Sequence, residues 1–340
     1  MFPVKILGRH IIFDEIIWLS SSGSRVDFTC EHCTKGTIVL HGDRTSQPDS
    51  TTHNRARYCV YLDGYPICTD VMDTPEKVIP LPFGTDSGCA VTVMKISEAS
   101  QSNLGVELRD FDGTVRPAEK KKRTIEFIGD SITCGYGIDG NVSMIYSTAI
   151  EDVRRSYAGR LAEALDADAA FTCFSGFGIV SGYTGDGVKN TQILVPDCYE
   201  KVGFCDQPIP GHERVNNYEW DFSFFQPEQI VINLGTNDLS YTKGEPEKEQ
   251  EYIDGYVAFL KTVRRRNPDA AILCVLGLMG TGLNDSMVRA VERYQSETGD
   301  LRVQAQPVAD QLKEDGYVPD FHPTPVSDQK LADQLLPLLR

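Results

Sequence analysis

Hydrophobic and polar residues alternate with a period of two along the first third of the chain. The alternation is clear over 26–30 and 90–96, and a further apolar run, 58–62, ends at the pair Asp63-Gly64. A period of two is typical of strands that bury one face, and Asp-Gly is favoured in tight hairpin turns. Because clusters of Gly, Ser, Asp and Pro separate these short strands, the pattern predicts a β-sandwich.

From Thr124 onward, apolar runs alternate with segments of helical period. The runs are 125–128, 169–174, 229–234 and 271–278, and the helical segments are 157–165, 252–263, 287–294 and 331–338. This alternation predicts a parallel sheet covered by helices on both faces, which is a three-layer α/β/α domain. We therefore expect a β-sandwich domain over 1–115, a basic, solvated linker over 116–123 and an α/β domain over 124–340.

The segment 182–217 interrupts this alternation, because it is rich in Gly and Pro and has no clear period. A loop of this length in a compact domain usually serves a function or lacks order. We predict that it lies near the carboxyl edge of the sheet, where open parallel sheets bind their ligands.

The formal net charge of −16 over 340 residues argues against binding to nucleic acid or to an anionic membrane, since both would repel the protein. The chain has no apolar stretch near the roughly 20 residues that a membrane span needs. Arg9, His10, Asp14 and Glu15 interrupt the N-terminal apolar run where a signal peptide would have its hydrophobic region. These features favour a cytoplasmic protein, or a secreted one if a leader has been removed, and they are compatible with a homo-oligomer.

Ten cysteines are scattered along the chain. Cys30-Glu31-His32-Cys33 has the spacing of half a zinc site, but no second Cys-x-x-Cys follows, so we expect no metal there. Cys59 and Cys68 flank the Asp-Gly turn symmetrically, and a tight hairpin would place them directly opposite each other in a non-hydrogen-bonded pair. Such a pair is either a disulfide or two buried thiols, and a reducing cytoplasm favours the thiols.

Four chemically capable groups lie at the ends of predicted strands or just before the last helix. Gly129-Asp130-Ser131 ends one strand, Gly176 and Asn237 follow two others, and His322 precedes the final helix. Because the carboxyl ends of parallel strands share one edge, we expect these groups to converge. A serine hydroxyl becomes a nucleophile when a base takes its proton, and His322 is predicted to be that base. A side-chain amide and a glycine N–H are suited to stabilise an oxyanion.

The residues near His322 include a candidate partner for its imidazole. Asp320 lies two residues before His322, where its carboxylate could orient the imidazole and stabilise the imidazolium, which corresponds to the chain order Ser, Asp, His. The other histidine of this half, His212, lies beside Pro210 and Gly211 in the long loop, and we interpret it as part of an exposed turn.

Together these segments resemble the four sequence blocks of the SGNH (GDSL-type) hydrolases. The resemblance is closer to carbohydrate esterase family 2, the acetyl-xylan esterase-like branch, and it covers nearly the whole chain. It implies a jelly-roll sandwich before an SGNH domain, Ser131 as nucleophile and His322 as general base. It also implies an oxyanion hole made by the Ser131 and Gly176 backbone N–H groups and the Asn237 side chain, with no metal or organic cofactor.

The chain departs from the wider family at one position. That family places an Asp three residues before the His, whereas Pro319 stands there and Asp320 is two residues before. The closer branch has this spacing, and some of its members are thought to orient the His through a backbone carbonyl. Both a Ser131-His322-Asp320 triad and a Ser-His dyad therefore remain open.

The resemblance implies a carbohydrate O-acetyl esterase that acts on acetylated xylo-, manno- or gluco-oligosaccharides through an acetyl-serine intermediate. The alternatives are a short-chain lipase or thioesterase of the GDSL type, and a catalytically lapsed carbohydrate-binding protein. Tyr136, Trp220 and Tyr241 neighbour the sequence blocks, and each is either a sugar-facing ring or an ordinary packing residue.

Overall fold

The computed structural model describes residues 1–83 and 88–340, and no helix within them is long and apolar enough to cross a membrane. The chain divides into two compact units. The first comprises Met1–Lys121, Ser147–Glu151 and Lys201–Trp220, and the second comprises Lys122–Tyr146, Asp152–Glu200 and Asp221–Arg340.

The predicted domain 124–340 is therefore interrupted, because two of its segments belong to the first unit. Arg57 donates to the carbonyl of the buried Glu151, and the Glu98 N–H donates to the Glu151 carboxylate. The Arg9 guanidinium donates to the carbonyl of Lys201 at 2.6 Å. Hydrogen bonds between residues far apart in sequence carry no periodic signal, so the pattern of the chain did not reveal them.

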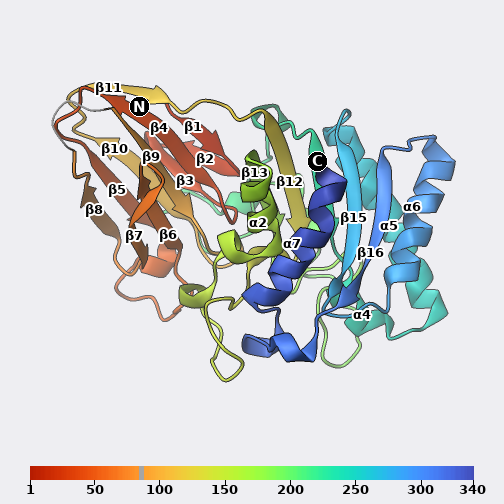
Figure 1. The fold of residues 1–340 in the computed structure, drawn as a ribbon. Coiled ribbons are helices and arrows are strands. Elements are labelled where there is room, and N and C mark those ends of the chain that lie inside the picture. The colour runs from red at the N-terminus through yellow and green to blue at the C-terminus, as the bar shows by residue number, and fades with distance from the viewer. Residues whose placement is uncertain (84–87) are drawn as a thin grey trace. The chain divides into compact units, whose positions relative to one another are not determined.

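The first unit contains two antiparallel sheets, as expected for a β-sandwich (Figure 1). One sheet has the order β1-β4-β9-β6-β7, with β11 pairing to β4, and the other has the order β2-β3-β10-β5-β8. Phe28, Val60 and Val93 of the first sheet pack with Leu40 and Val106 of the second in one buried core. The strands are β1 (Lys5–Leu7), β2 (His10–Phe13), β3 (Ile16–Leu19), β4 (Arg25–Glu31), β5 (Thr37–Gly42), β6 (Arg57–Leu62), β7 (Tyr65–Val71), β8 (Glu76–Pro80), β9 (Cys89–Lys95), β10 (Leu104–Arg109) and β11 (Thr114–Pro117).

The predicted linker 116–123 is shorter in the structure. Arg116 and Pro117 still pair with β4, and the next strand begins at Arg123. Pro117 lacks an N–H, but the last residue of a short strand at the sheet edge does not need one.

The predicted pairing of Cys59 with Cys68 is wrong. The Asp63-Gly64 turn forms as expected, but the register shifts between Val60 and Tyr61, so Cys59 lies opposite Thr69 and Cys68 lies opposite Val60. A β-bulge adds one residue to one strand, and every later pair is displaced by one position. Both cysteines are free thiols, and Cys59 Sγ accepts a hydrogen bond from the Thr69 hydroxyl at 3.2 Å.

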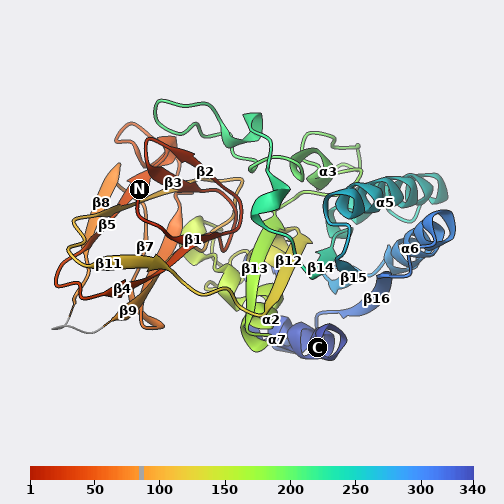
Figure 2. The same ribbon diagram turned by 90° about the horizontal axis from the view of Figure 1, so that it is seen from above.

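The second unit is the predicted three-layer α/β/α domain. Its parallel sheet has the order β13-β12-β14-β15-β16, with α2 and α7 on one face and α5 and α6 on the other (Figure 2). The strands are β12 (Arg123–Gly129), β13 (Ala167–Cys173), β14 (Gln229–Asn233), β15 (Ala271–Leu278) and β16 (Val303–Asp310), and the helices are α1 (Ser131–Cys134), α2 (Tyr157–Ala164), α3 (Val195–Cys198), α4 (Thr236–Thr242), α5 (Pro246–Arg266), α6 (Asn284–Thr298) and α7 (Pro325–Leu339).

The strand β16 was missed by the sequence pattern. It contains Gln304, Gln306 and Pro307, and among residues 1–83 and 88–340 it pairs only with β15, at the edge of the sheet. Edge strands tolerate polar residues and proline because one side of the backbone has no ladder partner. This edge strand therefore forms although its sequence has only a weak apolar alternation.

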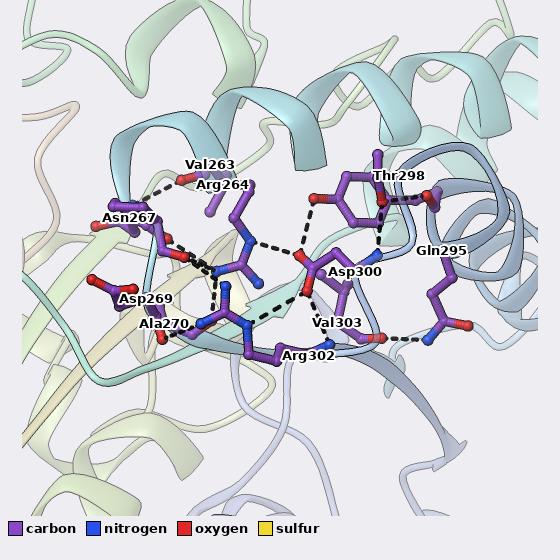
Figure 3. Close-up of polar contacts among 12 residues, drawn as sticks. Val263, Arg264, Asn267, Asp269, Ala270, Gln295, Thr298, Asp300, Arg302 and Val303 are labelled. Atoms are coloured by element: carbon purple, nitrogen blue, oxygen red, sulfur yellow. Dashed lines mark hydrogen bonds and ion pairs between the residues drawn. The ribbon is translucent and has the colours of Figure 1, made fainter.

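A polar network joins the end of α5 to the turn before β16 (Figure 3). The half-buried guanidinium of Arg264 donates to the Asp300 carboxylate at 2.7 Å and to the carbonyls of Asn267, Pro268 and Ala270. Arg302 donates to the carbonyls of Pro268 and Asp269. The network satisfies backbone acceptors where the chain leaves the helix.

Candidate active site

The sheet order places its topological switch point between β12 and β14. The strand β12 pairs with β13 on one side and with β14 on the other, so the chain leaves the ends of β12 and β14 toward opposite faces of the sheet. At a switch point of this kind, open α/β sheets bind their ligands in a crevice beyond the carboxyl ends of the strands. Ser131 lies two residues after the end of β12, and Asn237 lies four residues after the end of β14.

Ser131 is presented by a tight turn between β12 and α1. A side chain at Gly129 would place its Cβ 2.0 Å from Thr133 Oγ1, so the close approach of the next turn requires glycine. The Asp130 carboxylate caps α1 by accepting the Ile132 N–H at 3.0 Å. Ser131 is thus the first helical residue, and it is 6% exposed.

Ser131 and His322 form a hydrogen bond, although 191 positions separate them in the chain. Ser131 Oγ lies 2.8 Å from His322 Nε2, and His322 Nδ1 lies 3.1 Å from the Pro319 carbonyl oxygen. A carbonyl oxygen only accepts, so the proton of the neutral imidazole is on Nδ1 and Nε2 is the acceptor. Nε2 is therefore ready to take the serine proton.

Asp320 has a different partner from the one that a triad requires. Its carboxylate accepts a hydrogen bond from the Tyr136 hydroxyl at 2.7 Å, while the Pro319 carbonyl holds Nδ1 of His322. The arrangement corresponds to the backbone-oriented dyad that the sequence left open. Asp320 and Phe321 both have left-handed backbone conformations, with φ of 53° and 61°.

Two backbone N–H groups at the site are free to donate. In residues 1–83 and 88–340, no hydrogen bond uses the N–H of Ser131 or of Gly176. Gly176 has φ of +83°, a conformation that side chains rarely adopt. The Asn237 amide nitrogen lies 2.8 Å from the Phe177 carbonyl and 3.3 Å from the Asp130 carboxylate, which hold the side chain in place.

Two buried carboxylates support the loops that carry these donors. Asp238 accepts the backbone N–H groups of Ile179, Val180 and Ser181, so it holds the loop that follows Gly176. Burial raises the pKa of Asp238 to about 6. Burial, with a smaller contribution from the charge of Asp238, raises the pKa of Asp130 to about 7.

Known proteins resemble this chain over most of its length. The model of the GDSL-like lipase/acylhydrolase family matches residues 127–330. The chain belongs to this family. It is 33% identical over 282 residues to the cellulase/esterase CelE of Acetivibrio thermocellus. The aligned region covers 81% of this chain and 33% of that protein. This chain thus spans about a third of the length of CelE.

Two further relatives match over almost the whole chain. An acetylxylan esterase/glucomannan deacetylase of Cellvibrio japonicus is 27% identical over 99% of this chain and 88% of its own. The structure of a family two carbohydrate esterase from Clostridium thermocellum in complex with cellohexaose superposes with a TM-score of 0.81. That protein is 25% identical and covers 98% of this chain and 97% of its own. The predicted fold and family are confirmed.

The cavity of this GDSL-family protein contains both members of the Ser-His pair. Its volume is about 650 Å³. The residues that line it come from loops and from the helices α1 and α4 of the second unit: Ser131, Tyr136, Ser175, Gly176, Tyr183, Thr236, Asn237, Leu239, Ser240, Met279, Asp320 and His322. All five predicted catalytic and oxyanion-hole residues are therefore brought together in one cavity.

The three predicted aromatic residues have different surroundings. Tyr136 lines the cavity, but Trp220 and Tyr241 are not among its described lining residues. Trp220 is buried in the first unit against His10 and Arg9. The Tyr241 hydroxyl donates to Glu251 at 2.9 Å, and the Lys248 ammonium lies over the Tyr241 ring.

Tyr183 is a residue of the cavity that the sequence pattern did not reveal. This residue lines the cavity, and it is 61% exposed although it is aromatic. Its N–H donates to the Gly176 carbonyl at 2.8 Å, which ties the long loop to the loop that carries Gly176. The available signal was its position in the segment 182–217, because loops of that length often contribute to sites.

Proposed function

We propose that this protein is a carbohydrate O-acetyl esterase that works through an acetyl-serine intermediate. The observation that carries the proposal is the 2.8 Å contact between Ser131 Oγ and His322 Nε2 inside the cavity. Carbohydrate as substrate and acetyl as the acyl group are supported by the names of the relatives, a glucomannan deacetylase and an esterase bound to cellohexaose.

In the proposed acylation step, Ser131 Oγ attacks the acetyl carbonyl carbon while its proton moves to His322 Nε2. The Pro319 carbonyl continues to accept the Nδ1–H, so the imidazolium stays in one orientation. The same proton then passes to the sugar oxygen, and the sugar leaves as an alcohol. Water then gives a proton to His322 Nε2 and attacks the acetyl carbon, and His322 returns this proton to Ser131 Oγ as the C–Oγ bond breaks. Acetic acid leaves and ionises to acetate in solution.

The proposed oxyanion hole consists of the Ser131 and Gly176 N–H groups and the Asn237 amide. The two backbone donors have no other acceptor in the described part of the chain, so they need not give up a hydrogen bond to reach the oxyanion. These two donors stabilise the developing charge without reorganisation, whereas the Asn237 amide exchanges its longer hydrogen bond, 3.3 Å to the Asp130 carboxylate, for one to the oxyanion. A donor of this kind contributes about 2.7–4 kcal/mol in a known hydrolase.

Tyr183 is the aromatic residue that we propose to contact the sugar. Its ring is largely exposed at the cavity, which suits stacking on the apolar face of a pyranose. Tyr136 is less suited, because its ring stacks on Tyr146 at a centroid distance of 3.8 Å and on His322 at 4.2 Å.

The test is ester hydrolysis by the wild type and by Ser131→Ala. Acetate release is measured on acetylated xylo-, manno- and gluco-oligosaccharides, and an acyl-length series of p-nitrophenyl esters is measured beside it. Ser131→Ala should lose at least about a thousandfold in kcat/KM. The exposed Ser223→Ala, in the same unit, is the matched control and should retain full activity.

Three outcomes contradict the proposal. Full activity of Ser131→Ala would show that Ser131 is not the nucleophile. A preference for long acyl chains would identify a lipase or thioesterase. Glycan binding without hydrolysis of any short ester would identify a lapsed enzyme.

A further inference from the structure

Tyr136 is the middle ring of a three-ring stack that ends on the imidazole of His322. Its ring is nearly parallel to that of Tyr146, at 3.8 Å and 6°, and it stacks on His322 at 4.2 Å and 28°. Two rings this close to a third would overlap if they shared one face. They therefore lie on opposite faces, and Tyr136 has no open face for a sugar.

The hydroxyl of Tyr136 reaches the turn that carries His322. It donates to the Asp320 carboxylate at 2.7 Å. Asp320 and Phe321 precede His322 with φ of 53° and 61°, and left-handed conformations in two successive non-glycine residues are unfavourable. Such conformations persist only where neighbouring groups hold them.

Two backbone hydrogen bonds and one from the Gln311 side chain hold the rest of this turn. The His322 N–H donates to the Pro319 carbonyl at 3.1 Å, and the Val318 N–H donates to the His322 carbonyl at 3.0 Å. The Gln311 amide donates to the Phe321 carbonyl at 2.8 Å. The Asp320 side chain, which these bonds do not use, is held by Tyr136.

We propose that Tyr136 is a positioning residue for His322 and that Asp320 acts on the imidazole through Tyr136. The stack fixes the plane of the imidazole, and the hydroxyl–carboxylate bond fixes the turn whose Pro319 carbonyl holds Nδ1. This inference rests on the proposed esterase function, because it assigns residues that prepare the base of that reaction.

The stack also favours the charged state of the base. When His322 takes the serine proton, the imidazolium lies against the π face of Tyr136, and a cation is attracted to that face. The ring is thus matched to the state that forms during acylation. Removal of the ring is expected to lower kcat more than it changes KM.

The experiment compares Tyr136→Phe, Tyr136→Leu and Asp320→Ala on two substrates. The first is p-nitrophenyl acetate, which has no sugar, and the second is an acetylated xylo-oligosaccharide. Tyr136→Phe keeps the stack and loses the hydroxyl, whereas Tyr136→Leu loses both. Tyr241→Phe is the matched control, because it removes another tyrosine–carboxylate hydrogen bond, 2.9 Å long, outside the cavity lining.

We expect Tyr136→Phe and Asp320→Ala each to lower kcat about threefold to tenfold, since each removes the same hydrogen bond to a charged group. The double variant should be no slower than either single one, because the second change finds nothing left to remove. Tyr136→Leu should lose about a hundredfold in kcat on both substrates, the loss that a misplacement of about 1 Å produces. KM for p-nitrophenyl acetate should stay within about twofold, as expected when an interaction specific to the transition state is lost.

Two results overturn the inference. If Tyr136→Leu is slow only on the oligosaccharide, through a raised KM, the ring binds sugar. If Asp320→Ala slows the enzyme further in the Tyr136→Phe background, the carboxylate acts on His322 directly. Tyr136→Phe supports the comparison even if Tyr136→Leu does not fold. Activity of the wild type on the acetylated oligosaccharide supports the proposed function whatever the Tyr136 variants do, so failure of the two proposals can be told apart.

Discussion

Gly137 lies where a single added methyl group should displace His322, the proposed general base. A Cβ at this position would lie 2.9 Å from Cδ and 3.1 Å from Cγ of Pro319, whereas ordinary contact begins near 3.4 Å. Pro319 is a rigid ring and its carbonyl holds Nδ1 of His322. Gly137→Ala must therefore push this turn by up to about half an ångström. Because a 1 Å misplacement can cost about a hundredfold, we expect a loss of about tenfold in kcat.

The same substitution also strains the backbone, because Gly137 has φ of +62°. Alanine in a left-handed conformation costs about 1–2 kcal/mol of stability. Gly299 separates this effect from the displacement, because it has φ of +73° and nothing lies within 4 Å of a Cβ built on it. Gly299→Ala should therefore lose similar stability and keep its kcat.

The assay measures kcat and KM on p-nitrophenyl acetate, together with the free energy of unfolding in urea, for both alanine variants. Equal kcat values for Gly137→Ala and Gly299→Ala, at similar losses of stability, would refute the link between the Pro319 turn and the imidazole. Restored activity of Gly137→Ala at lower temperature, without a change in the folded fraction, would also count against a fixed displacement.

Two further predictions concern stability. Burial raises the pKa of Asp328, which accepts the Tyr157 N–H, to about 8. A raised pKa stabilises the fold below the unfolded-state pKa, and this contribution is lost as pH rises toward 8. Between about pH 4 and 8, the free energy of unfolding of the wild type should therefore fall by up to about 1.4 kcal/mol per pH unit relative to that of Asp328→Asn. Urea denaturation at pH 5, 6 and 7 measures this difference, and a difference that does not change with pH contradicts the prediction. Arg264→Met should cost about 2–4 kcal/mol, because it removes the hydrogen bonds that Arg264 donates to the Asn267 and Ala270 carbonyls and its ion pair with Asp300. Arg264→Lys should recover only part of this loss; thermal unfolding that leaves both variants at the wild-type Tm would be the opposite result.

The local patterns of the chain determined much of the fold and the positions of the reactive groups. Apolar period two and Asp-Gly predicted the β6–β7 hairpin, and strand–helix alternation predicted the parallel sheet. Ser131, Gly176 and Asn237 follow the ends of separate strands, and such ends share one edge in a parallel sheet. Convergence of these groups with His322 was therefore predictable without coordinates.

Tertiary structure decided the features that depend on one residue of register or on a partner far away in the chain. One inserted residue in β7 separated Cys59 from Cys68. The alternation of apolar and polar residues along a strand does not indicate where a β-bulge occurs. The partner of Asp320 is Tyr136, 184 positions earlier, because the folding of the turn at 319–322 aims its carboxylate at that hydroxyl. Residue type and spacing show which groups can react, but only the packed chain decides which acceptor each donor meets.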